Sequence, residues 1–421
     1  MVSQQVADWF ERASVGLFVH WGISSVHGEV DLSWGMVEDK PWGDGRSIDP
    51  EEYWALADEF DPDAYDPDRW LRAAREAGME YAVLTARHHD GFALWPSEFG
   101  EFSTKQHLDR RDLVGEYVDA CRRQGLKVGL YYSGPDWYHP DFPVNPGPYG
   151  GPEMSAPESV DGSDVADFET YFGYVKGQVG ELATRYGDLD LFWFDGSPTF
   201  GPVDRGPAEL YDLLRSENPG IVVNDRGDEH LGDYYTPEVE LPERPMDGPW
   251  ELCQTWAGQW GYAADESFPD LDWTLERLAT TVGRGGNLLL NVGPRPDGDL
   301  SEAAYERLAE LAEWMDANEP AVRDVEGGPF PPRADVPITR RGNTWYIHAL
   351  AGHERVAVDH VTRPRDVRLL RNGARASFTF DDGTLEIDVP ASTRASPDEV
   401  VAVTWDHPTE GEYWPLKGRP E

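Results

Sequence analysis

The chain has 421 residues, and its 79 acidic side chains outnumber its 36 basic ones, which gives a formal net charge of −43. A charge of this sign and size repels nucleic acid and anionic membranes, so both are excluded as partners. The acids are dispersed along the chain and lysine is scarce, a composition typical of proteins that stay soluble in multimolar salt. The composition therefore predicts a halophilic source.

The N-terminal segment contains no basic stretch followed by a long apolar run, and no uninterrupted apolar run in the chain approaches the length of a membrane span. The two cysteines, Cys121 and Cys253, lie in apolar segments and are expected to be buried thiols. These features predict a soluble, cytoplasmic protein and leave a homo-oligomer open.

Strand-like and helix-like segments alternate through about residue 325, a rhythm that predicts a parallel sheet. We predict a catalytic (β/α)₈-like barrel over residues 1–328, although only seven clear strands can be recognised. A doubly wound open sheet is the alternative, but no phosphate-binding glycine motif follows the first strand. The Pro/Gly-rich stretch 134–163 is interpreted as a rim loop or lid. The predicted strands are 16–20, 81–86, 127–133, 188–195, 220–225, 250–256 and 287–292, and the predicted helices lie near 50–60, 66–77, 111–124, 164–186 and 301–317.

A Gly/Pro-rich break at residues 327–332 ends this rhythm, and only short strands separated by turns follow it. This pattern predicts a small all-β sandwich domain over residues 329–421, without a catalytic cluster of its own. The strands expected there are 344–350, 355–358, 377–380, 385–389 and 400–405.

Three of the predicted barrel strands end in side chains that can do chemistry. The segment 188–196 ends in Asp195, the first strand is followed by His20, and the second by His88 and His89. In α/β barrels, the C-terminal ends of the strands carry the catalytic residues. We therefore expect these side chains to meet in an active site.

The motifs Phe18–Gly22, Thr85–Phe92 and Trp193–Gly196 together resemble those of the family 29 glycoside hydrolases, the retaining α-L-fucosidases. The resemblance implies a catalytic barrel followed by a β-sandwich, no cofactor, and a fucosylated glycan or small fucoside as substrate. It also implies that Asp195 is the nucleophile. Supporting matches, in the family's order, are Asn224–Arg226, Tyr235–Glu238, Trp250–Glu251, Gln259–Tyr262 and Gly285–Pro294.

Two glutamates compete for the role of the general acid/base. Glu238 lies in Thr-Pro-Glu, on a loop that could reach across the site, and it is favoured over Glu251, which precedes an apolar strand segment. Glu251 is then expected to line the site or to be structural. The resemblance further implies a sugar pocket in which imidazoles and an arginine bind hydroxyls while aromatic faces accept the methyl group. Its expected members are His20, His88, His89, Tyr131, Trp193, Arg226 and Trp260, with Tyr132 as the alternative to Tyr131.

The sequence departs from the family in the first loop, where many members carry an acid before Trp-Tyr. Here Ser33 precedes Trp34, so the carboxylate is missing or is supplied by Glu29, Asp31 or Glu38. A related sugar such as L-galactose and an inactive carbohydrate-binding role therefore stay open as alternatives. A metal centre at the two neighbouring histidines is disfavoured, because adjacent side chains at a strand end are expected to point in different directions.

Overall fold

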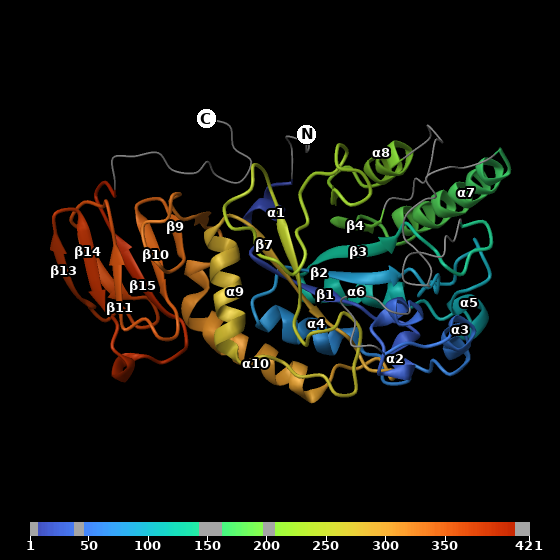
Figure 1. Ribbon diagram of the computed structural model, residues 1–421, viewed down its shortest axis with the longest axis horizontal. Helices are drawn as coiled ribbons and strands as arrows, with labels where there is room; N and C mark the ends of the chain where they lie inside the picture. Colours follow the sequence, from blue (N-terminus) through green and yellow to red (C-terminus); the bar gives the residue numbers. More distant parts are fainter. Residues whose placement is uncertain (1–6, 38–45, 143–161, 197–206, 409–421) are drawn as a thin grey trace.

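The computed structural model describes residues 7–37, 46–142, 162–196 and 207–408. It consists of a curled parallel sheet with helices around it, and two antiparallel sheets at one end of the molecule (Figure 1). Within the described ranges, no helix has the length and apolar character needed to cross a membrane. Both cysteines are buried and free, as predicted.

Seven parallel strands in the order β5-β4-β3-β2-β1-β7-β6 form the main sheet. All seven were predicted, because each contains a run of apolar residues that is covered on both faces. The neighbours of each strand lie far apart in the sequence, as right-handed β/α crossovers require. The strands are β1 (Val15–Val19), β2 (Tyr81–Arg87), β3 (Lys127–Ser133), β4 (Leu191–Asp195), β5 (Val222–Val223), β6 (Glu251–Thr255) and β7 (Asn287–Val292).

The eighth element of the barrel is an irregular segment, residues 234–238, that lies between β5 and β6. Tyr234 forms a parallel bridge with Asn224 after β5, while Tyr235 and Glu238 form parallel bridges with Trp250 and Cys253 beside and within β6. Backbone hydrogen bonds from Glu251 N to Tyr235 O (2.9 Å) and from Cys253 N to Pro237 O (3.1 Å) complete this connection. The barrel is thereby closed, and Glu238 belongs to its wall rather than to a free loop.

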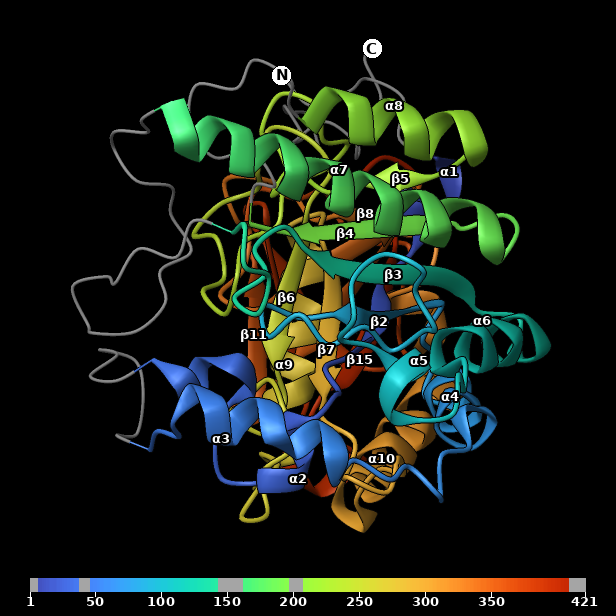
Figure 2. The ribbon, with the colours of Figure 1, turned by 90° about the vertical axis from the view of Figure 1, so that its right-hand side faces the viewer.

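Helices cover the outside of the sheet (Figure 2), and their apolar faces join the strands in the largest core cluster. Local capping sets their ends: the Asp112 side chain accepts from Gly115 N at the start of α6, and Gly125 ends that helix in a left-handed conformation. Two helices that the sequence did not single out, α8 and α9, also pack here. The longer helices are α4 (Pro67–Glu76), α6 (Leu113–Gln124), α7 (Gly162–Arg185), α8 (Pro207–Glu217), α9 (Leu271–Gly283) and α10 (Glu302–Asn318). Shorter helices are α1 (Asp8–Arg12), α2 (Ser24–His27), η1 (Leu32–Met36), α3 (Pro50–Ala55), η2 (Leu56–Asp58), α5 (Thr104–His107), η3 (Glu319–Ala321) and η4 (Ala391–Thr393).

The β-sandwich follows α10 and contacts the ends of α9 and α10. Its sheets have the orders β12-β15-β10-β9-β8 and β11-β14-β13, and a separate apolar core lies between them. Trp314 Nε1 of α10 donates to Asp398 O (3.1 Å), and Gly328 N donates to Gly283 O (2.8 Å), so the two parts are joined by buried hydrogen bonds. The strands are β8 (Glu326–Gly327), β9 (Ile338–Arg341), β10 (Thr344–Ala349), β11 (Arg355–Val358), β12 (Asp366–Leu369), β13 (Ser377–Asp381), β14 (Thr384–Asp388) and β15 (Glu399–Thr404).

Candidate active site

A pocket lies at the C-terminal ends of the barrel strands. Seven of the predicted site side chains line it together with Glu238, and three lining residues, Phe18, Trp34 and Cys253, were not predicted. The predicted members are His20, His88, Tyr131, Trp193, Asp195, Arg226 and Trp260. A larger cavity of about 360 Å³ lies between α9 and the sandwich, but it contains neither Asp195 nor Glu238.

The register of β3 and β4 brings Asp195 and two aromatic rings onto the same face. Tyr131 pairs with Trp193, and Ser133 pairs with Asp195. Since residues two apart on a strand share a face, Trp193 lies one step below Asp195, and its ring stacks on Tyr131 with centroids 5.5 Å apart. Gly196, with φ +68°, is required after Asp195, because a Cβ there would lie 2.7 Å from Pro135 Cδ.

Two groups donate hydrogen bonds to the Asp195 carboxylate, and His89 lies beside them. The Tyr131 hydroxyl donates to Oδ2 (2.7 Å), Arg226 Nη1 donates to Oδ1 (3.2 Å), and His89 Nε2 lies 3.6 Å from Oδ2. Burial raises the pKa of Asp195, but the Arg226 charge and the Tyr131 hydrogen bond act against it, and the pKa is lower than usual. Asp195 is therefore ionised at neutral pH and is oriented at the base of the pocket.

Arg226 connects the two carboxylates of the pocket. Its Nη2 donates to Glu238 Oε2 (2.7 Å) while Nη1 binds Asp195, and its guanidinium lies 4.6 Å from the Trp193 ring centroid. The side chain of Glu238 is 42% exposed and that of Asp195 is 17% exposed, so Glu238 is the more accessible of the two. A carboxyl group at this place can exchange protons with solvent and with a bound ligand.

Glu251 lies deeper in the barrel and does not line the pocket. It is fully buried as the first residue of β6, where it accepts hydrogen bonds from the Tyr81 hydroxyl and from Trp193 Nε1 (3.1 Å). Burial raises the pKa of Glu251 to about 7, against the opposing effect of these two donors. Both oxygens of Glu251 thus accept hydrogen bonds, and one of the donors is the Trp193 side chain that lines the pocket.

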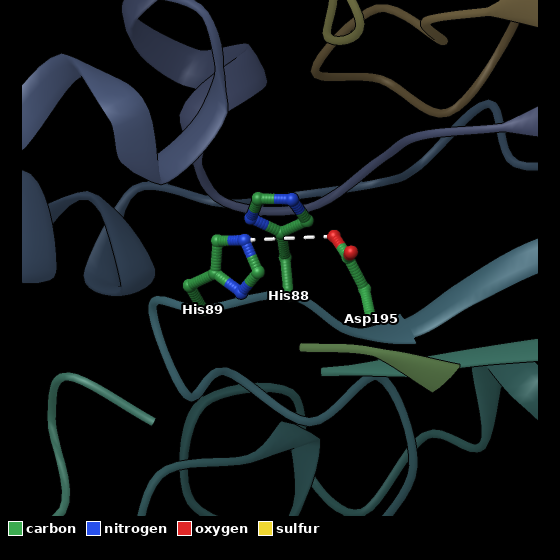
Figure 3. Close-up of side chains that lie close together, drawn as sticks. All are labelled: His88, His89 and Asp195. Carbon is green, nitrogen blue, oxygen red and sulfur yellow. Dashed lines mark ion pairs between the residues drawn. The ribbon is translucent and has the colours of Figure 1, made fainter. Parts of the chain in front are cut away.

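The three predicted histidines converge beside Asp195 (Figure 3 shows two of them). The rings of His88 and His89 lie 4.1 Å apart, and ligand atoms of both lie within 4.8 Å of one another and of Asp195. The expectation that these two side chains point apart is therefore wrong. Burial lowers the pKa of His20 to about 3 and that of His89 to about 4, and it also lowers the pKa of His88. All three rings are neutral at neutral pH.

His88, His89 and Asp195 are close enough together to hold a cation, but the neighbouring charge of Arg226 opposes one. The Arg226 guanidinium already binds Asp195 at 3.2 Å, so a divalent ion would meet a fixed positive charge. The same neutral imidazole nitrogens suit the hydroxyl groups of a sugar.

The described part of the first loop, up to residue 37, supports the pocket, and neither Glu29 nor Asp31 lines it. Asp31 Oδ1 accepts from Trp260 N (2.9 Å) and from Gly261 N (3.0 Å), and thereby holds the loop that carries Trp260. The Ser33 hydroxyl pairs with His88 Nδ1 (2.6 Å). Glu29 is exposed, and Glu38 lies outside the described residues.

The described part of the predicted rim loop, residues 134–142, borders the histidines. Trp137 N donates to His89 O (2.8 Å), and the Trp137 ring lies 5.2 Å from the His89 ring. Arg87 and Asp136 form a buried ion pair (3.1 Å) that fixes this loop to the end of β2. The rest of the predicted lid, residues 143–161, lies outside the described ranges.

A carboxylate pair in an aromatic- and histidine-lined pocket, at the C-terminal end of a barrel, is the arrangement of a glycoside hydrolase. The family model for alpha-L-fucosidase matches residues 1–320. The chain belongs to this family.

Individual relatives agree with this assignment. The chain is 30% identical to tissue alpha-L-fucosidase of Rattus norvegicus over 345 residues, which covers 76% of this chain and 70% of the relative. Its identity to the Bos taurus protein of the same name is 31%, over 76% of this chain and 69% of the relative. Among solved structures, alpha-L-fucosidase isoenzyme 1 from Paenibacillus thiaminolyticus is similar with a TM-score of 0.80 and 30% identity, covering 94% of this chain and 97% of that one. The Thermotoga maritima alpha-fucosidase has a TM-score of 0.75 and 27% identity, covering 95% and 97%. The predicted barrel followed by a β-sandwich is thus confirmed.

Proposed function

We propose that Asp195 and Glu238 are the two catalytic carboxyl groups of this chain, which is a retaining α-L-fucosidase. The observation that supports these roles is that both carboxylates line one pocket and bind the same guanidinium, that of Arg226. Retaining glycosidases need two carboxyl groups about 5–5.5 Å apart, one as nucleophile and one as acid/base.

In the first step, Asp195 attacks the anomeric carbon while Glu238 protonates the leaving oxygen. The low pKa of Asp195 keeps it ionised, and its fixed hydrogen bonds orient it for the attack. In the second step, Glu238 takes a proton from water, which then displaces the sugar from the covalent fucosyl-enzyme. The exposure of Glu238 suits this exchange, because the acid must be protonated again from solvent in each cycle.

Glu251 fits the acid/base role less well, although its pKa is raised. Glu251 is the first residue of β6, whereas Glu238 lies opposite Cys253, the third residue of that strand. Glu238 is therefore about 6.6 Å closer to the C-terminal ends of the strands. Both oxygens of Glu251 already accept hydrogen bonds, and Trp193 lies between it and the pocket. A general acid must first be within hydrogen-bond reach of the leaving oxygen, and only then does its pKa matter. We assign Glu251 to the support of the Trp193 ring.

The sugar is held by the neutral imidazoles, Arg226 and the aromatic rings. Trp260 lies 5.0 Å from the His20 ring, and Trp34 lies 5.3 Å from the His89 ring, so apolar surface alternates with polar groups around the pocket. Such a lining suits a deoxy sugar with three hydroxyls and a methyl group. Terminal α-L-fucosides are the substrate class that we assign, and aryl α-L-galactosides serve as the comparison in assays.

The nucleophile is tested with Asp195→Gly. Loss of a nucleophile costs several orders of magnitude in rate, and azide in the vacated space should restore part of it and yield β-L-fucosyl azide. Asp190→Gly, at an ion-paired acid just before β4, is a control that removes a carboxylate without touching the pocket. Substantial unaided hydrolysis by Asp195→Gly would refute the assignment.

The acid/base is tested by comparing Glu238→Ala with Glu251→Ala. Removal of the true acid should slow substrates with poor leaving groups far more than activated aryl fucosides. Azide should then intercept the fucosyl-enzyme and give α-L-fucosyl azide, the opposite anomer to that of the nucleophile variant. If Glu251→Ala shows this behaviour and Glu238→Ala does not, the two roles must be exchanged.

The charge of the chain supports a proposal about its working conditions. A net charge of −43 creates strong self-repulsion in dilute buffer, which concentrated salt screens. We assign the enzyme to a salt-rich cytoplasm, and cell fractionation with sedimentation in molar KCl would test both its location and whether it forms a homo-oligomer.

A further inference from the structure

His20 lines the pocket and His89 is buried directly behind it, next to Asp195. In each ring, Nδ1 is bonded to a group that can only accept a hydrogen bond there. A neutral imidazole carries one hydrogen, on Nδ1 or on Nε2, and the partner of one nitrogen decides which. The hydrogen-bond pattern around His20 and His89 therefore fixes the character of the nitrogen that is left over.

For His20 the deciding partner is Asn291, in β7. Asn291 Nδ2 donates to Trp260 O (2.7 Å), and a carbonyl oxygen can only accept. The orientation of the amide is thereby fixed, and it is Oδ1 that faces His20 Nδ1 at 2.6 Å. Because Oδ1 is an acceptor, His20 Nδ1 carries the hydrogen.

For His89 the deciding partner is Ser133, the last residue of β3. The Ser133 hydroxyl donates its single hydrogen to Pro135 O (2.6 Å), so toward His89 Nδ1 (2.5 Å) it can only accept. His89 Nδ1 is thus protonated. Its Nε2 is buried and has no hydrogen-bond partner within the described ranges, and it lies 3.6 Å from Asp195 Oδ2, another acceptor.

We propose that Asn291 and Ser133 are positioning residues that hold His20 and His89 in the Nδ1–H tautomer, so that each ring presents an Nε2 lone pair to the sugar. The hydroxyl groups of the sugar then donate to these two nitrogens. The statement about the sugar rests on the fucosidase function, whereas the statement about the tautomers does not.

Two observations support this direction of hydrogen bonding, from the sugar hydroxyls to the imidazole nitrogens. Burial lowers the pKa values of both rings, which keeps them neutral and leaves a lone pair on each. The buried Nε2 of His89 and Asp195 Oδ2 lie 3.6 Å apart, and none of the described residues donates a hydrogen bond to this Nε2. A sugar hydroxyl beside this pair would supply the missing donor. His88 differs, because its partner Ser33 can either donate or accept through its hydroxyl.

The direct test is nitrogen NMR of the resting enzyme labelled with ¹⁵N-histidine. The chain has 11 histidines, and the spectra of His20→Gln and His89→Gln assign the two rings. We expect pyrrole-type shifts for Nδ1 and pyridine-type shifts for Nε2 in both. An Nε2–H tautomer at either ring overturns the proposal for that ring, whether or not the protein hydrolyses fucosides.

The positioning role is tested with Ser133→Ala and Ser133→Thr. Without the hydroxyl, His89 should move its hydrogen to Nε2 and donate to Asp195, and kcat should fall by at least tenfold with a smaller change in KM. Ser133→Thr keeps the acceptor and should restore both the tautomer and the rate. An unchanged His89 tautomer in Ser133→Ala overturns the role of Ser133, and if that variant does not fold, the wild-type spectrum still decides.

The direction of the sugar's hydrogen bonds is tested with deoxy and deoxyfluoro analogues of L-fucose as inhibitors. Fluorine cannot donate, so at hydroxyls that face the two rings a fluorine should weaken binding as much as a hydrogen does. If fluorine retains most of the affinity at every position, the rings donate and the proposal is wrong. Failure of all analogues and of L-fucose to bind would instead refute the fucosidase function, with the NMR result unaffected.

Discussion

Glu251→Gln should change the pH dependence of folding stability by a predictable amount. Burial raises the pKa of Glu251 from 4.5 to about 7, so the folded state binds this proton more tightly than the unfolded chain does. The stability contributed by the protonated carboxyl is complete below pH 4.5, and it is lost as the pH rises toward 7. Since one pKa unit corresponds to about 1.4 kcal/mol, the loss amounts to about 3 kcal/mol.

Glutamine keeps the acceptor for Trp193 Nε1 and can donate to the Tyr81 hydroxyl oxygen, but it does not titrate. The assay is urea unfolding of wild type and Glu251→Gln from pH 4 to pH 9, at constant salt. Relative to wild type, the variant should gain about 3 kcal/mol between the two ends of this range. Taking the difference between the ends cancels any constant effect of the substitution on packing.

The matched control is Glu59→Gln, the same exchange at an exposed position, which should follow the wild-type pH dependence. Parallel stability curves for wild type and Glu251→Gln would refute the reasoning, because they would mean that Glu251 is not held protonated by burial. If the variant instead lost stability relative to wild type between pH 4 and pH 9, the sign of the reasoning would be wrong.

Three further predictions concern the pocket and the surface. Asp31→Ala should raise KM about tenfold with little change in kcat, because the Trp260 and Gly261 amides lose their acceptor. Asp31→Asn keeps an acceptor and should keep near-normal kinetics, so equal effects of the two variants would contradict this role. Arg226→Gln should move the acidic limb of the kcat/KM profile to higher pH, because its charge holds the pKa of Asp195 down, and an unmoved limb would show that it does not. Melting temperature and fucosidase rate should rise with KCl up to molar concentrations, where the Debye length is about 3 Å; a flat or falling response would refute the halophilic interpretation.

The sequence predicted the strands that are continuous and apolar, and it failed where the backbone pairs irregularly. β4 reads Leu-Phe-Trp-Phe-Asp, which allows few alternatives to a buried strand. Residues 234–238 read Tyr-Tyr-Thr-Pro-Glu, and Pro237 cannot donate to a ladder, so this eighth barrel element resembles a loop in sequence. In the sandwich, β9 and β12 contain arginines and were missed, because half of their residues face solvent.

The candidate site was predictable to the extent that its residues end strands. Asp195 and the three histidines do so, and the structure brings them together. The sequence favoured Glu238 over Glu251 but could not show how deep each lies in the barrel. The structure places Glu251 at the start of β6, where it accepts a hydrogen bond from Trp193. Asn291 and Ser133 were missed as well, although a polar residue near the end of an apolar strand was the available signal.

The irregular segment 234–238 gives the two carboxyl groups to which we assign catalysis backbones of unequal rigidity. Asp195 ends a strand with hydrogen-bonded neighbours, whereas Glu238 lies on a segment joined to β5 and β6 through isolated bridges, and no helix occurs between Asp225 and Trp250. Residues 239–249, which lead from Glu238 to β6, contain no helix or strand, so an insertion there would leave the strand pairing of the barrel intact. The position of Asp195 is thus tied to the sheet, whereas the position of Glu238 depends on a segment with fewer backbone contacts. For engineering of leaving-group preference, residues 239–249 are therefore a segment beside Glu238 whose length can be varied, provided that Leu241 and Met246 keep their contacts with the core.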